Sequence, residues 1–247
     1  MHISITPEIL FHIGALPVTN TLLTAWLVVI VVTVAAIIFS VTLKRLPGRI
    51  QTAIEAVVEG LLGFFETIAG SKETAKRFFP IVATVFIFVL LSNWAGVIPG
   101  VGSIGFHEVH EGKETFVPLF RSVFSDLNMT LALALIAVSL SHFFGIVTLG
   151  IKGHVGKFIT FKSPVAAFTG ILEIVSEIAK VISFSFRLFG NIFAGEVLLT
   201  IIAFLIPYIA PLPFLGLELF VGFIQAVIFA TLAMVAFSSF TVAHDSH

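Results

Sequence analysis

Five long apolar segments constrain the fold more than any other feature of this sequence. A helix needs about 20 apolar residues to cross roughly 30 Å of hydrocarbon. Only 11% of the residues are charged, against about 25% in soluble domains, so lipid is the main solvent of the chain. The sequence therefore predicts an all-α polytopic membrane protein in which residues 1–247 form a single membrane domain. The five predicted spans are 22–43, 78–98, 127–149, 164–206 and 214–242.

The fourth apolar segment is too long for an upright span. As one helix it would be on the order of 64 Å long, about twice the membrane thickness. We expect it to lie strongly tilted or to be broken, although Gly190 and Gly195 do not force a break. Pro207, Pro211 and Pro213 are expected to end it and turn the chain. The last two helices should then form an antiparallel hairpin.

Residues 50–69 follow a different pattern from the spans. Gln51, Glu55, Glu59 and Glu66 fall within one narrow stripe of a helix, and apolar residues occupy the rest of its surface. This pattern predicts an amphipathic helix that lies at the membrane interface or packs on protein.

The distribution of basic residues predicts the orientation. Positive residues concentrate in cytoplasmic loops, so the N-terminus is expected outside and the tail from Ala243 inside. The loops predicted to be inside hold Lys44, Arg45, Arg49, Lys72, Lys76, Arg77, Lys152, Lys157 and Lys162, against Lys113 and Arg121 outside.

Arg187 is the most informative single residue, because it lies midway along the fourth apolar segment. An Arg at the centre of a span costs about 2.5–3.5 kcal/mol by insertion scales. It stays protonated, so it cannot relay a proton by titrating, but its charge keeps a nearby carboxylate ionised. Ser183, Gly190, Asn191 and Ala194 share its helix face and would let another helix approach closely. A structural Arg paired within the bundle, and ordinary packing of this stripe, are the alternatives.

Two acids flank the predicted outer turn. Glu196 precedes the turn, Glu218 follows it, and Gln225 shares a helix face with Glu218. Glu196 lies about 180° around the helix from Arg187, so the sequence points to a counter-charge from another chain. The acid–acid–amide series suggests a hydrated proton path that leads inward from the outer face. Two carboxyls held neutral by hydrogen bonds are the alternative.

A second polar stripe lies toward the inner side. Glu173, Glu177 and Lys180 share one helix face, which continues through Ser183 to Arg187. The stripe is equally compatible with a path to the cytoplasmic side and with an intrahelical Glu177–Lys180 pair in interfacial water.

The third span carries its own polar face. Asn128, Ser139 and His142 lie within about 40° of one another on an ideal helix, and Asp126 stands at its outer end. We expect these residues to line the outer entrance; a packing role is the alternative for a lone His in a span.

Several binding sites are disfavoured by context. The glycines of 100–105 match the spacing of a dinucleotide fingerprint, but Pro99 precedes them and the polar run 107–111 follows, which is expected to be an exposed loop. There is no Walker-type phosphate loop and no Cys, and the formal charge of −1 offers no basic face. We therefore expect no cofactor, no metal, no ATP bound by this chain and no nucleic acid.

Three motifs carry a resemblance to a known family. The run Ser185–Glu196, with the sequence SFRLFGNIFAGE, closely resembles the signature of subunit a of F-type ATP synthase. The run QAVIF from Gln225 and the run DLNMT at 126–130 resemble two further motifs of that family. The span count and the long penultimate segment also agree, so the likeness covers nearly the whole chain.

The resemblance implies a non-catalytic stator subunit beside a rotating ring of c subunits. The family's essential Arg corresponds to Arg187, which would face the ring carboxylate, and two offset half-channels would carry protons to and from it. The outer half-channel positions fall on Asn191, Glu196, Glu218 and Gln225. Family members vary at the two acidic positions, one often being His, whereas this chain has Glu at both.

The resemblance also implies partners and a location. The chain would contact b-type peripheral stalk subunits as well as the c ring and membrane lipid, with 50–69 as the candidate stalk contact. A bacterial inner membrane is expected rather than a mitochondrial one, because the motif at 126–130 is similar to that of bacterial members.

Two other functions compete with this one. A self-contained proton-coupled secondary transporter or channel would usually show inverted repeats, and five unequal spans without repeats argue against it. A non-transporting scaffold subunit would tolerate Arg187→Lys or Arg187→Gln, and it leaves the two acids unexplained.

Overall fold

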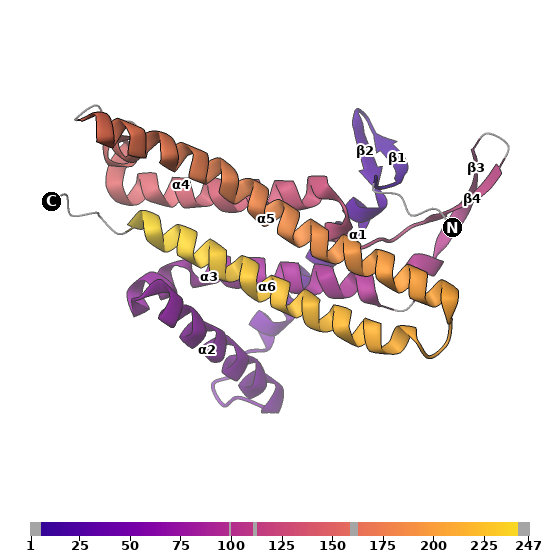
Figure 1. The fold of residues 1–247 in the computed structure, drawn as a ribbon. Coiled ribbons are helices and arrows are strands. Elements are labelled where there is room, and N and C mark those ends of the chain that lie inside the picture. Colours follow the sequence, from indigo (N-terminus) through magenta and orange to yellow (C-terminus); the bar gives the residue numbers. More distant parts are fainter. Residues whose placement is uncertain (1–5, 99, 111–112, 159–162, 242–247) are drawn as a thin grey trace. The chain divides into compact units, whose positions relative to one another are not determined.

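The computed structural model describes residues 6–98, 100–110, 113–158 and 163–241. Within them it has six α-helices, and all except α2 are long and apolar enough to cross a membrane. The expected all-α polytopic membrane fold is thus confirmed. The helices are α1 (Asn20–Thr42), α2 (Arg49–Ala69), α3 (Lys72–Val97), α4 (Leu127–Phe158), α5 (Pro164–Leu205) and α6 (Pro211–Thr241), as Figure 1 shows.

Two short antiparallel hairpins, which the sequence analysis did not predict, precede α1 and α4. Strand β1 (Ile9–Ile13) pairs with β2 (Leu16–Thr19), and β3 (Gly105–His110) pairs with β4 (Lys113–Pro118). The expectation that the run 107–111 is a loop is therefore wrong for 107–110, which form a strand, and residue 111 lies outside the described residues. The glycine run before it leads into a strand and not into the helix that a dinucleotide fingerprint requires.

Helix α5 is continuous from Pro164 to Leu205, so the long fourth segment is not broken. The prediction that Pro211 and Pro213 lie in the turn is wrong, because both stand in the first turn of α6. Proline is tolerated there, since the first N–H groups of a helix have no partner within it. Residue 242, the predicted end of the last span, lies outside the described residues, as does the tail that follows it.

Helix α4 extends beyond the predicted span end at 149. Gly150 interrupts it with φ 73° and ψ 161°, and helical residues resume until Phe158. A positive φ of this kind is accessible to glycine but strained for other residues. The kink therefore depends on the identity of residue 150.

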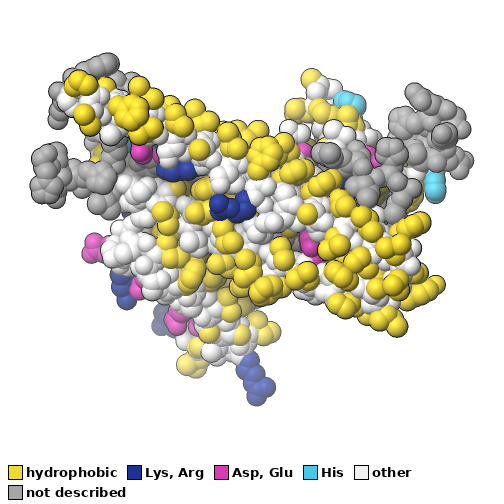
Figure 2. Space-filling view, viewed as in Figure 1, with side chains coloured by type: hydrophobic (Ala, Val, Ile, Leu, Met, Phe, Trp, Pro, Cys, Tyr) yellow, Lys and Arg dark blue, Asp and Glu magenta, His cyan; other side chains and the backbone are white. Residues whose placement is uncertain are grey.

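The fold divides into two compact units, each described by itself. Unit 1 comprises Met1–Leu46, Phe86–Thr130 and Arg187–Val227; unit 2 comprises Pro47–Val85, Leu131–Phe186 and Ile228–His247. The sequence-based expectation of a single membrane domain stays a prediction. Figure 2 shows hydrophobic side chains over much of the visible surface and few charged ones, as expected of helices that face lipid.

Each unit contains a contact between α5 and α6. In unit 1, Gly195 of α5 lies against the carboxylate of Glu218 in α6. In unit 2, the rings of Phe184 in α5 and Phe229 in α6 have centroids 5.6 Å apart. The earlier residue of α5 meets the later residue of α6, which is the order expected of an antiparallel hairpin.

Aromatic packing forms much of the core of unit 2. Phe78, Phe144 and Phe237 form a triangle in which ring centroids lie 5.0 to 5.6 Å apart. Phe78 and Phe237 are fully buried. The two edge-to-face pairs, Phe78–Phe144 and Phe144–Phe237, add to the dispersion contacts that hold helices together in a membrane.

Candidate functional site

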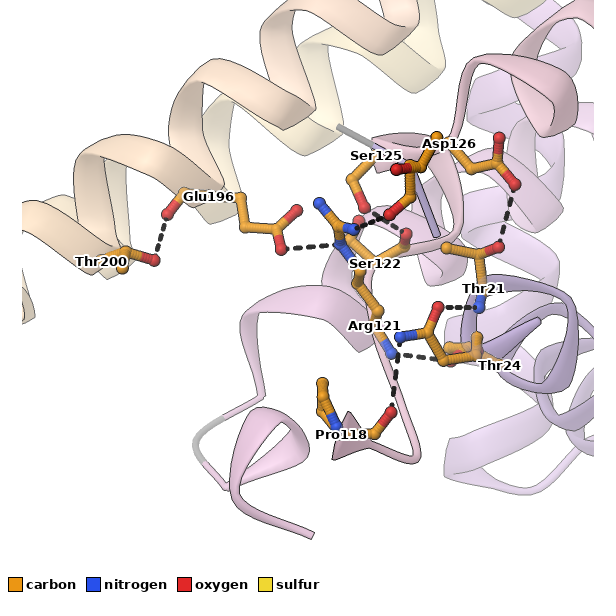
Figure 3. Close-up of polar contacts among 11 residues, drawn as sticks. Thr21, Thr24, Pro118, Arg121, Ser122, Ser125, Asp126, Glu196 and Thr200 are labelled. Carbon is orange, nitrogen blue, oxygen red and sulfur yellow. Dashed lines mark hydrogen bonds and ion pairs between the residues drawn. The ribbon is translucent and has the colours of Figure 1, made fainter. Parts of the chain in front are cut away.

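Arg121 stands at the centre of the polar contacts in unit 1 (Figure 3). Its Nε donates a hydrogen bond to Oε1 of Glu196 over 2.9 Å, and the two side chains are 10% and 32% exposed. The backbone N–H of Arg121 donates to Oγ1 of Thr24 over 3.2 Å, and a guanidinium nitrogen donates to the carbonyl of Thr6 over 3.4 Å. Because a guanidinium is always charged, this arrangement holds a permanent positive charge beside Glu196.

Glu196 keeps one oxygen available for a proton. Its Oε2 is buried and has no hydrogen-bond partner among the residues that the structure describes. Its Oε1 is occupied by Arg121, and its backbone carbonyl accepts from the hydroxyl of Thr200 over 2.7 Å. A carboxylate with one oxygen anchored and the other without a hydrogen-bond partner can accept and release a proton without losing its position.

The sequence alone gives Arg121 no role beyond that of a charge in an outer loop. Arg121 and Glu196 are 75 residues apart, and one lies in a loop while the other lies in a helix. No periodicity connects two such positions, so only the tertiary structure brings them together.

Asp126 joins the start of α4 to the start of α1. Its Oδ2 accepts from the hydroxyl of Thr21 over 3.1 Å, and its Oδ1 accepts from the backbone N–H of Asn128 over 2.9 Å. The second bond is an N-cap, which satisfies a helix donor that lacks a partner. Asp126 is buried and Asn128 is exposed. The structure thus gives Asp126 a clear structural function, and its place at a proton entrance stays a prediction.

Glu218 is buried against α5 in unit 1. A Cβ atom at Gly195 would overlap its carboxylate, so the absence of a side chain at residue 195 makes room for the acid. Glu218 and Gln225 are each 8% exposed. Two turns of helix separate them, and they share one face of α6.

Helix α3 packs on the same part of α6. The side-chain amide of Asn93 donates to the carbonyl of Gly222 over 2.9 Å, and Nε1 of Trp94 donates to the carbonyl of Leu219 over 3.0 Å. Gly222 lies between Glu218 and Gln225, and a Cβ there would come within 3.0 Å of Asn93. Close contact with α3 therefore helps to hold the polar face of α6 in place.

The face of α5 that carries Arg187 is open. Arg187, Gly190, Asn191 and Ala194 are all exposed, and so is Ser183. The intervening residues Leu188, Ile192 and Gly195 are buried, because the opposite face of the helix packs within the chain. The stripe that the sequence analysis assigned to a partner helix is therefore accessible to one.

Two of the expected inner residues, Glu177 and Lys180, form an ion pair in unit 2. Glu177 is 7% exposed, and its Oε1 accepts from Nζ of Lys180 over 2.7 Å. The pair considered as an alternative in the sequence analysis is thus present. Glu173, one turn earlier, is half-buried. Among the described residues, no group of three His, Cys, Asp or Glu side chains is placed to hold a metal ion.

His142 lies with these inner residues. Its Nε2 is 3.6 Å from Oε2 of Glu177, and its Nδ1 is 3.1 Å from Nε2 of His154. On an ideal helix His142 shares a face with Asn128, but Asp126 and Asn128 belong to unit 1 and His142 belongs to unit 2. The place of His142 at the outer entrance stays a prediction. His154 had not been singled out at all.

The Arg121–Glu196 pair can be tested by a double-mutant cycle on the free energy of unfolding, measured by denaturation of the purified protein. Arg121→Ala is expected to lower that free energy by about 1 kcal/mol, the upper end for a partly exposed ion pair. In a Glu196→Gln background the loss should be smaller, since the ion pair is already absent. Additive losses would show that Arg121 acts independently of Glu196.

Comparison with known proteins gives a consistent family. Residues 22–238 match the ATP synthase A chain family. The chain is 35% identical over 240 residues to ATP synthase subunit a of Campylobacter jejuni, covering 96% of this chain and 91% of the relative. It is 30% identical to ATP synthase subunit a of Moorella thermoacetica, covering 97% and 99%, and 33% identical to that of Campylobacter fetus, covering 90% and 89%. The chain therefore belongs to the ATP synthase A chain family.

Proposed function

We propose that this chain is the proton-translocating stator of the membrane sector of an ATP synthase. It carries two offset half-channels, which lead to and from a carboxylate on a rotating ring of c subunits and are separated by Arg187. The observation that carries the proposal is the open stripe of α5, where a cation in an apolar helix is surrounded by small and polar residues. Such a stripe lets a partner helix approach closely.

Arg187 would act as a fixed charge and not as a proton carrier. A ring carboxylate that has released its proton stays ionised while it passes the guanidinium. The same positive charge disfavours a proton that would pass directly from one half-channel to the other. Each charge that crosses the membrane supplies about 2.3 kcal/mol per 100 mV, which the ring converts into rotation.

The outer half-channel is proposed to run along the polar residues of unit 1. Glu196 has a carboxylate oxygen without a hydrogen-bond partner among the described residues, and it lies beside Arg121. The path then continues along α6 through Glu218 and Gln225. Asn191 lies one helical turn after Arg187 on the open stripe. It would be the last residue of this path before the ring. Asp126 and Asn128 at the start of α4 would mark the entrance.

The inner half-channel is proposed to run along Glu173, Glu177, Lys180 and Ser183 of α5. These positions share one helix face with Arg187. The proposed orientation places the N-terminus outside and the C-terminus in the cytoplasm of a bacterial cell, because the basic residues concentrate in the segments 44–77 and 152–162 of the sequence. Helix α2, in which only Phe65 is buried, is the proposed contact for a peripheral stalk.

Cysteine cross-linking tests the proposed ring contact, because the native chain has no Cys. Asn191→Cys and Ala194→Cys, introduced separately into the whole complex, are expected to form disulfides with cysteines placed on the outer helix of the c subunit. The product would be a band of the combined mass on a non-reducing gel. Ile192→Cys is the matched control, because it is the next residue along α5 and is 4% exposed. Equal cross-linking at residue 192, or none at 191 and 194, would contradict the proposal.

A further inference from the structure

Unit 2 contains two histidines beside Glu177, His142 and His154, that the proposed half-channels do not yet include. His154 contacts His142, and His142 faces Glu177, with nitrogen–nitrogen and nitrogen–oxygen distances of 3.1 Å and 3.6 Å. His154 and Glu177 are 4% and 7% exposed. Two imidazoles and a carboxyl group are thus gathered in one place, with His154 and Glu177 buried and the His142 side chain 30% exposed.

The backbone is built to bring these groups together. Gly150 interrupts α4 with its positive φ, and residues twelve apart along the chain then come into contact. The ring of Phe158 packs on both imidazoles, with centroid distances of 5.7 Å to His142 and 5.3 Å to His154. The carbonyl of Phe158 occupies the space that a Cβ atom at Gly170 would need, so this segment also lies against α5.

The arrangement has the chemistry of a proton relay. A neutral imidazole donates from one ring nitrogen and accepts at the other, so a hydrogen-bonded pair can pass a proton along. Glu177 is oriented by Lys180, which binds Oε1. Its Oε2 is buried, has no hydrogen-bond partner in the described part of the chain and lies toward His142. That oxygen can hold the transferred proton.

We propose that Glu177, His142 and His154 form a proton relay in the inner half of the path; this rests on the proposed function and adds a route to it. A proton leaves Oε2 of Glu177 and binds Nε2 of His142. The proton on Nδ1 of His142 then passes to Nε2 of His154, so each bond that breaks is matched by one that forms. The 3.6 Å step exceeds a hydrogen bond and requires a side-chain rotation at Glu177 or His142.

Helix α5 carries two further charged groups on the face of Glu177: Lys180, which is bound to Glu177, and Glu173 one turn earlier. The contacts of α3 and α6 with α4 in this unit include phenylalanine rings that pack on Phe144. A proton on His142 would therefore lie beside a carboxyl group that Lys180 already binds.

The test is passive proton conduction through the membrane sector in inverted vesicles from which the catalytic sector has been stripped. His142→Gln and His154→Gln keep a hydrogen-bonding side chain but cannot titrate. Each is expected to lower conduction about tenfold or more, in line with the contribution of a positioned acid–base group. Each should also flatten the dependence of conduction on the pH of the proposed cytoplasmic side. Imidazole added to a His154→Ala variant should restore part of the rate, which a merely structural role would not allow.

The matched control is His12→Gln, which alters an exposed histidine in β1 of the other unit and should leave conduction unchanged. Conduction in both relay variants at the wild-type rate and with the wild-type pH profile would overturn the relay. If wild-type vesicles themselves conduct no protons, the proposed function fails rather than the relay alone.

A second measurement uses the wild-type complex and so does not depend on whether the variants assemble. In ¹⁵N spectra of the wild-type complex, the facing nitrogens of His142 and His154 should appear as one protonated donor and one unprotonated acceptor joined by a hydrogen bond. Spectra without a hydrogen bond between the two nitrogens would overturn the proposal.

Discussion

Arg187→Ala is expected to abolish proton-driven ATP synthesis while the complex still assembles. Among the five described residues of the open stripe of α5, only Arg187 carries a charge. Alanine at this position cannot keep a passing carboxylate ionised. Assembly should persist because the side chain is exposed and does not fill the chain's own core. ATP synthesis in energised vesicles, together with subunit content on a native gel, measures both outcomes.

The matched variants separate a transport role from a scaffold role. Phe204→Ala removes another exposed side chain, 72% accessible near the end of α5, and should leave synthesis intact. Arg187→Gln should fail like alanine, because its amide makes hydrogen bonds without a charge. Synthesis at the wild-type rate in Arg187→Gln would favour a scaffold subunit and contradict the proposed function.

Gly195→Ala is expected to lower proton-driven synthesis about tenfold without unfolding the chain. Its new Cβ atom would overlap the Glu218 carboxylate, which must move. The carboxylate is the end of a flexible side chain, so the helices can stay in place, and alanine is the better helix former by about 1 kcal/mol. Displacement of a reacting group by even about 1 Å can cost orders of magnitude in rate. The rate of ATP synthesis, compared with the thermal stability of the complex, measures the two effects separately.

A compensating substitution makes this prediction specific. Glu218→Asp shortens the side chain by one methylene group, so Gly195→Ala combined with Glu218→Asp should recover part of the lost rate. Gly216→Ala is the matched control in α6, because no atom lies within 4 Å of a Cβ built there. If the double variant is slower than either single variant, the close approach of residues 195 and 218 does not limit proton transfer.

Much of the fold could be predicted because the membrane imposes simple rules on sequence. An apolar helix long enough to cross hydrocarbon is recognisable from composition alone, and α4 and α5 begin at residues 127 and 164, where the sequence predicts them. The hairpins before α1 and α4 were missed because they are short and carry no long-range pattern. The prolines at 211 and 213 were misplaced because proline ends one helix and begins the next equally well.

The candidate site was predictable where one helix holds all of its members. The spacing of Ser183, Gly190 and Asn191 around Arg187 placed them on one face, and the structure leaves that face open. Contacts between distant segments were not predictable. Arg121 meets Glu196 across a loop, and His142 meets His154 only because Gly150 lets α4 double back.

The sequence by itself determined that this protein lies in lipid and where along the chain a charge stands within an apolar segment. Apolar length and the high free energy of an Arg in hydrocarbon are local properties that need no neighbours to be read. Only the tertiary structure decided which acid lies beside which base and where a missing side chain makes room for a carboxylate. Those contacts join segments that are far apart in the chain, and packing geometry, which no helical period encodes, sets them.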